Sequence, residues 1–104
     1  MRISFIALIA TLAASPRIRT VVTVEAQVLD RYVGEYELAP AFHIVVTRDS
    51  TGLFVQATGQ PKLQIYAESD SAFFLKVVDA QITFVRNGLI LHQNGQDVPG
   101  RKIR

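Results

Sequence analysis

Residues 81–96, which read QITFVRNGLILHQNGQ, carry the clearest signal of the fold. Apolar and polar residues alternate on both sides of two Asn-Gly pairs, Asn87-Gly88 and Asn94-Gly95. Both central residues of a type I′ turn need a positive φ, which Asn and Gly tolerate best, and the twist of this turn matches that of the strands it joins. The stretch therefore predicts two consecutive β-hairpins.

Short alternating segments also fill the chain before this stretch. Each is about six residues long and is followed by turn-forming residues, which predicts strands over residues 32–38, 42–47, 53–58, 62–67 and 72–77. Residues 27–32 predict a short helical lead-in, and Pro99 makes the last segment an edge strand or a bulged one because proline cannot donate to a ladder. No segment has the length of a crossover helix. The predicted class is therefore all-β, with eight antiparallel strands in a meander that closes into a small barrel.

The alternation also predicts which side chains face the barrel interior. They are Leu53, Val55, Leu63, Ile65, Phe73, Leu75, Ile82, Phe84, Leu89 and Leu91. In an eight-stranded barrel with strands this short, such side chains largely fill the interior.

The opposite face carries one apolar residue on each of five successive strands. These residues are Phe54, Tyr66, Phe74, Val85 and Ile90. Since successive strands of a meander are neighbours, we predict that they form an apolar stripe that binds a partner. The alternative is that bulges shift the phase of one or two strands and scatter or bury these side chains.

Composition and charge exclude several classes of protein. Apolar residues make up 49% of the 104 residues, which suits a packed core and not a disordered chain. The first 26 residues contain three Arg and one Glu, whereas residues 27–104 contain 8 Lys plus Arg and 8 Asp plus Glu. This neutral body lacks the basic patch on which nucleic-acid binding depends, so we predict no nucleic-acid partner. The sequence has no cysteine, which excludes disulfides and thiolate metal sites.

The N-terminus has the pattern of a signal peptide. A short positive start, Met1-Arg2, precedes the apolar residues 3–14, a run too short to span a hydrocarbon core about 30 Å thick. Small residues offer one cleavage region at residues 11–15 and another at residues 24–26. The alternative is that the apolar run is a buried N-terminal helix or strand.

This pattern sets the predicted domain organisation. Residues 1–26 are predicted to comprise a signal peptide and an N-terminal arm, and residues 27–104 to form the barrel domain. The predicted location is secreted or periplasmic, with no stable membrane anchor after the leader is removed.

Four segments in order resemble one family. They are residues 32–38, 53–61, 73–84 and 91–95. Together they resemble the lipocalin-like domain found C-terminal to β-lactamase-related serine peptidases and esterases, long catalogued as a domain of unknown function. The resemblance implies a small barrel that acts as an accessory module beside a penicillin-binding-protein-like catalytic domain in exported proteins, with no activity of its own.

The sequence departs from this family in two respects. No catalytic domain precedes the matching segments here, so the chain is expected to be either a free-standing secreted module or a detached C-terminal one. The Asn87-Gly88 hairpin also looks shorter than the usual family loop.

No catalytic motif is present in the sequence. Ser-x-x-Lys, Lys-Thr-Gly, Gly-x-Ser-x-Gly, His-Glu-x-x-His and the phosphate-binding glycine loops do not occur. We therefore predict that the chain is not an enzyme, has no catalytic residues and needs no cofactor.

The two histidines and two of the glutamates are candidates for a metal site or an acid/base pair. His43 and His92 could meet in a zinc-like site near Glu35 or Glu37, but their spacing is not that of a metal motif, so surface histidines are favoured and no metal is predicted. Glu35 and Glu37 lie two residues apart on one strand face, which indicates a polar face more than an acid/base pair.

Lys76 and Arg86 end apolar strands, where inward-pointing cations could bind a carboxylate, although solvated strand ends explain them equally well. The leading hypothesis is an exported interaction module that associates with itself or with a separate serine-hydrolase-type partner. The alternatives are a carrier that binds a small apolar ligand at the barrel mouth and, third, a minor hydrolase.

Overall fold

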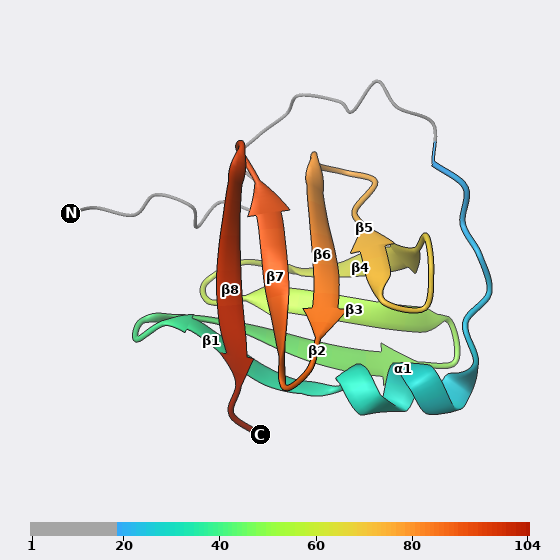
Figure 1. Cartoon of the computed structure of the whole chain (residues 1–104), viewed down its shortest axis with the longest axis horizontal. Helices are drawn as coiled ribbons and strands as arrows, with labels where there is room; N and C mark the ends of the chain where they lie inside the picture. The colour runs from blue at the N-terminus through green and yellow to red at the C-terminus, as the bar shows by residue number, and fades with distance from the viewer. Residues whose placement is uncertain (1–18) are drawn as a thin grey trace.

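The computed structural model describes residues 19–104 as one short helix followed by eight strands (Figure 1). Each strand pairs antiparallel with the next, and β1 pairs with β8, which closes a barrel. The predicted class is therefore confirmed. The apolar run and the first predicted cleavage region of the leader lie outside the described residues. The elements are α1 (Ala26–Tyr32), β1 (Gly34–Ala39), β2 (Phe42–Asp49), β3 (Gly52–Ala57), β4 (Lys62–Ala67), β5 (Ala72–Phe74), β6 (Ala80–Val85), β7 (Gly88–Gln93) and β8 (Gln96–Lys102).

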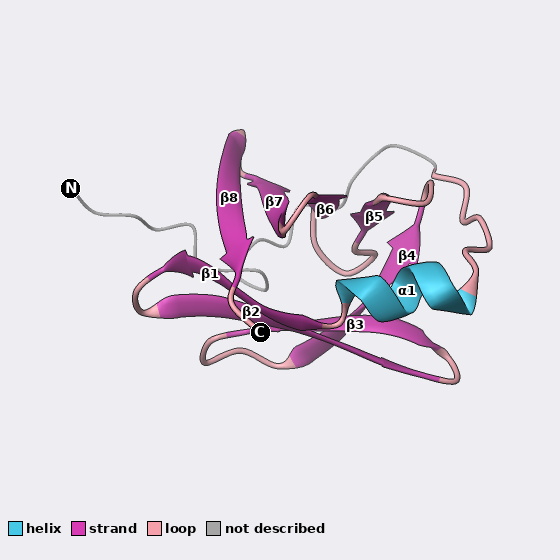
Figure 2. Cartoon of the chain, turned by 60° about the horizontal axis from the view of Figure 1, so that its bottom comes forward, coloured by secondary structure: helices cyan, strands magenta, loops and turns pink. Residues whose placement is uncertain are grey.

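Helix α1 lies beside β2 at the margin of the barrel (Figures 1 and 2). Its last residue, Tyr32, stacks on Phe84 of β6 with ring centroids 4.0 Å apart, and the Tyr36 hydroxyl donates to the Tyr32 carbonyl oxygen at 2.8 Å. Burial raises the pKa of Tyr36 to about 12, so this hydroxyl remains a donor at neutral pH. Tyr32 thus ends the helix and does not begin the first strand.

None of the helices between residues 19 and 104 has the length and apolar character of a membrane-spanning segment.

The predicted interior is confirmed. Nine of the ten predicted side chains are buried, and the tenth, Leu63, is partly buried against the same cluster. Tyr36, Phe42, Ile44 and Val46 from the first two strands also belong to the core, together with Ala57, Ala67, Val78 and Ala80. The interior is therefore packed with side chains, as expected for strands of this length.

The two Asn-Gly pairs form different turns. Asn94 and Gly95 both have positive φ, 56° and 75°, and connect the pair Gln93 and Gln96, as a type I′ turn requires. At the other pair only Asn87 has a positive φ, 59°, because Gly88 is already the first residue of β7 and pairs with Val85. The prediction that both are type I′ turns is therefore wrong at Asn87-Gly88.

Gly88 is needed for a different reason. A Cβ atom there would collide with the carbonyl oxygen of Gly100 on β8. The glycine allows a close approach of the backbones of β7 and β8.

Strand β5 is shorter than the predicted strand over residues 72–77. It ends at Phe74, after which the Leu75 N–H donates to the Ala80 carbonyl oxygen at 3.0 Å and starts a loop back into β6. Leu75 and Val78 of this loop are buried, whereas Val77 at its outside is 65% exposed. The loop therefore contributes to the core without continuing the sheet.

Residues 19–25 run along the outside of the barrel before α1, and we call them the strap (Figure 1). The Arg19 guanidinium donates to Glu68 at 2.6 Å, and the Val22 N–H donates to the carbonyl oxygen of Ala67, the last residue of β4, at 2.9 Å. The described part of the predicted N-terminal arm is therefore attached to the folded barrel.

Candidate functional site

The five residues of the predicted stripe lie on the outer face, but their exposure differs. Their chain neighbours Leu53, Ile65, Phe73, Phe84 and Leu89 belong to the core cluster. On the outside, Val85 is 47% exposed and Phe54, Tyr66 and Ile90 are half-buried, whereas Phe74 is only 5% exposed and stands outside the core cluster. The alternation of inward and outward side chains in these five strands is as predicted, and no bulge interrupts it. The prediction that the stripe is exposed along its whole length is wrong at Phe74, because a covering segment buries this side chain.

Cations cover the aromatic half of this face. The Arg19 guanidinium lies 5.7 Å from the centroid of the Phe74 ring, the Lys76 ammonium 4.0 Å from that of Tyr66, and the Lys62 ammonium 5.6 Å from that of Phe54. A cation over a ring face is attracted by the quadrupole of the ring, and its methylene stem covers apolar surface. The three rings, which we call the aromatic patch, are therefore partly occupied by the chain's own side chains.

Polar side chains divide the stripe into two halves. Phe74 of β5 pairs with Gln81 of β6, and Ile90 of β7 pairs with Thr83 of β6. Gln81 and Thr83 thus lie between the aromatic patch and a second group, Val85, Ile90 and Pro99, which we call the aliphatic patch. Its three residues line one shallow groove that Glu37 and Arg101 also line.

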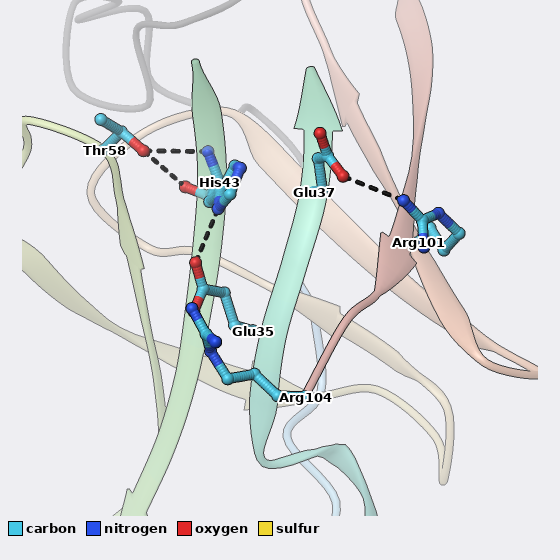
Figure 3. Close-up of polar contacts among 6 residues, drawn as sticks. All are labelled: Glu35, Glu37, His43, Thr58, Arg101 and Arg104. Carbon is cyan, nitrogen blue, oxygen red and sulfur yellow. Dashed lines mark hydrogen bonds and ion pairs between the residues drawn. The ribbon is translucent and has the colours of Figure 1, made fainter. Parts of the chain in front are cut away.

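A charged network joins β1, β2 and β8 across the closure of the barrel (Figure 3). The His43 Nδ1–H donates to Glu35 Oε2 at 2.6 Å, and Arg104 Nε donates to Glu35 Oε1 at 2.7 Å. Arg101 donates to Glu37 Oε1 at 3.0 Å. The two glutamates share the outer face, as predicted, but each is held in an ion pair.

Hydrogen bonds from His43 and Arg104 hold the pKa of Glu35 below its usual range. A carboxyl group with a lowered pKa stabilises the fold above the usual glutamate pKa of about 4.3, and this contribution is lost as the pH falls from that value through the lower pKa of the folded state.

We therefore expect Glu35→Gln to lower the free energy of unfolding at pH 7, with the difference from wild type shrinking as the pH falls below the usual glutamate pKa of about 4.3. Urea denaturation at a series of pH values measures this. Glu37→Gln is the matched control on the same face, because it removes a carboxylate with the single partner Arg101. A difference for Glu35→Gln that does not change with pH would contradict the assignment.

The two histidines lie on different strands and do not form one site. His92 of β7 accepts from the Thr83 hydroxyl through Nε2 at 2.9 Å and donates through Nδ1 to Asp97 at 2.7 Å. This order of hydroxyl, imidazole and carboxylate is the one that activates nucleophiles. However, the N–H of Phe84, beside Thr83, donates to the Ser71 carbonyl oxygen at 2.8 Å, so it is not available to an oxyanion. The arrangement links β6, β7 and β8.

The two cations predicted at strand ends, Lys76 and Arg86, lie on the surface. Both are exposed, so neither points into the packed interior. In the described range, residues 19–104, no three His, Cys, Asp or Glu side chains form a group that could hold a metal ion.

Sequence reasoning missed the partners in these networks. Arg19, Arg101 and Arg104 are 49, 64 and 69 residues from the carboxylates they bind. The pair His92 and Asp97 could have been found, because a two-residue turn at Asn94-Gly95 places these residues opposite each other.

Comparison with known proteins gives one family and one relative. The family model described as Domain of unknown function (DUF3471) matches residues 19–92. Penicillin-binding protein 4* of Bacillus subtilis (strain 168) is 25% identical over 79 residues, which cover 71% of this chain and 18% of that protein. The matched segment therefore spans less than a fifth of that relative's length. No solved structure gives a significant match.

Proposed function

We propose that this chain, which belongs to the family described as Domain of unknown function (DUF3471), is an accessory module of a β-lactamase-related serine hydrolase. In this proposal the module is exported and non-catalytic. One observation carries the proposal. The similar segment of penicillin-binding protein 4* is a small part of a much longer chain, which suits a module that works beside another domain. That the barrel is lipocalin-like is part of the same proposal.

The aliphatic patch is the surface that suits a partner best. Val85 is 47% exposed, and its neighbours Ile90 and Pro99 extend it along one groove. Exposed apolar side chains that share a groove with charged ones resemble the core and rim of a protein interface. The aromatic patch suits this role less, because three cations already lie over its rings.

The contacts of the strap favour the first of the two predicted cleavage regions. Cleavage after Ala26 would remove Arg19 and Val22, which bind Glu68 and Ala67. The family match also begins at residue 19. Within this proposal the leader is cleaved before Arg19, in the region of residues 11–15.

We expect Val85→Ser with Ile90→Ser to reduce capture of a co-expressed β-lactamase-related serine hydrolase from the same organism at least tenfold, because two such anchors contribute on the order of 2 kcal/mol. The measurement is pull-down from the exported fraction, with light scattering to detect self-association. Val45→Ser is the matched control, since Val45 is 38% exposed on β2 outside the aliphatic patch. Undiminished capture by the double variant would contradict the proposal that the aliphatic patch binds the partner. An exported chain that keeps its full mass would contradict the proposal that the leader is removed.

A further inference from the structure

A small apolar cavity lies between the strap and the barrel wall, beside the ends of β3, β4 and β5. Its volume is about 190 Å³. Val22 and Val24 of the strap, Leu29 of α1 and the barrel residues Ile65 and Phe73 contribute to its lining. Among residues 19–104, no charged side chain lines it. The cavity adjoins the packed barrel interior, because Leu53, Ile65 and Phe73 of the core cluster line it, and it shares no residue with the aliphatic patch.

The strap holds this cavity open in a defined shape. At one end, Arg19 both donates to Glu68 at 2.6 Å and covers the Phe74 ring. In the middle, the Val22 N–H bonds to the Ala67 carbonyl oxygen at 2.9 Å. At the other end the strap continues into α1, where Leu29 packs against the core. Both walls are therefore fixed before any ligand arrives, which lowers the entropic cost of binding.

The strap leaves apolar surface unburied. Val21 is 48% exposed and Val22 is 39% exposed, and both line the cavity. The polar side chains in the lining already have partners: the Gln64 amide donates to the Thr51 carbonyl oxygen at 3.0 Å, the Thr51 hydroxyl to Asp49 at 2.6 Å and the Tyr66 hydroxyl to Gln64 Oε1 at 3.4 Å. A molecule that fills this space would gain free energy by covering apolar surface and would not have to satisfy hydrogen bonds.

We propose that the space between the strap and the barrel is a binding site for a small, uncharged, apolar molecule about the size of one substituted aromatic ring. The uncharged lining excludes a carboxylate or ammonium ligand, since either would be desolvated without a partner. The size follows from the volume, because an engineered apolar cavity of about 150 Å³ in another protein binds benzene. The site does not rest on the accessory role.

The first experiment titrates the folded protein with toluene and follows the methyl groups by NMR. We expect saturable shifts at Val22, Val24, Leu29 and Ile65, with a dissociation constant on the order of 1 mM or tighter. Benzoate, which has the same ring and a charge, is the matched ligand and should give no saturable shift. Toluene shifts that stay linear up to the solubility limit, or that spread over the whole surface, would overturn the proposal.

The second experiment fills the cavity from its exposed side. Val22→Phe should weaken toluene binding at least tenfold, because the larger side chain occupies the same space. Val45→Phe, an equal enlargement of an exposed valine on β2 away from the cavity, should leave binding unchanged. Equal affinity in the Val22→Phe variant would contradict the site. If the Val22→Phe variant does not fold, the test is made on the wild type saturated with toluene. Nuclear Overhauser contacts between toluene and the strap valines would support the proposal, and their absence would reject it.

Discussion

Gly88→Ala is expected to lower the free energy of unfolding by about 3 kcal/mol, although alanine is the smallest possible side chain. The added Cβ atom would collide with the Gly100 carbonyl oxygen, and that oxygen belongs to the backbone of β8. Backbone in a paired strand cannot move aside as a flexible side chain can, so β7 and β8 would have to separate. Urea denaturation of the purified protein measures the loss.

Two other glycines separate this steric effect from backbone strain. Gly59 and Gly95 have φ of 74° and 75°, and a Cβ atom at either would meet no other atom within 4 Å. Gly59→Ala should therefore cost only about 1 kcal/mol, and Gly95→Val somewhat more than that, because a β-branched residue tolerates a positive φ poorly. A loss at Gly88 no greater than that at Gly59 would show that the strands do not approach this closely. An unchanged midpoint for Gly95→Val would mean that the hairpin is misplaced.

Phe74→Ser is expected to destabilise the domain by about 2 to 3 kcal/mol, even though Phe74 lies on the outer face of the barrel. The ring is 5% exposed, packs against Tyr66 and is covered by Arg19, so its loss leaves a cavity under the strap. The measurement is the midpoint and slope of a urea transition followed by circular dichroism.

Phe54→Ser is the matched control, because Phe54 is a half-buried aromatic residue of the same patch that faces Lys62. It should cost less than about 1 kcal/mol. Equal and small losses for both variants would indicate that the strap does not cover Phe74 in solution and would restore the aromatic patch as a candidate interface. A large loss at Phe74 alone leaves Val85 and Ile90 as the part of the predicted stripe that is open to a partner.

The two histidine networks show how far local patterns reach. A two-residue turn at Asn94-Gly95 sets the register of β7 and β8, so the contact between His92 and Asp97 is implied by residues 92–97 alone. The contact between Glu35 and Arg104 has no such local origin. It exists only because β8 returns to β1 when the barrel closes.

Local sequence pattern was enough to predict the number and order of the strands, the antiparallel class and the side chains of the interior. A period of two is a property of neighbouring residues, so Leu53, Ile82 and Leu91 show their direction without reference to the rest of the chain. Three features are visible only in the folded chain. Gly88 allows β7 and β8 to pack closely, Arg19 covers Phe74, and a cavity lies beneath the strap. Periodicity shows which face a side chain is on. How far that face is covered depends on segments dozens of residues away, and their position is set only when the barrel closes and the strap packs against it.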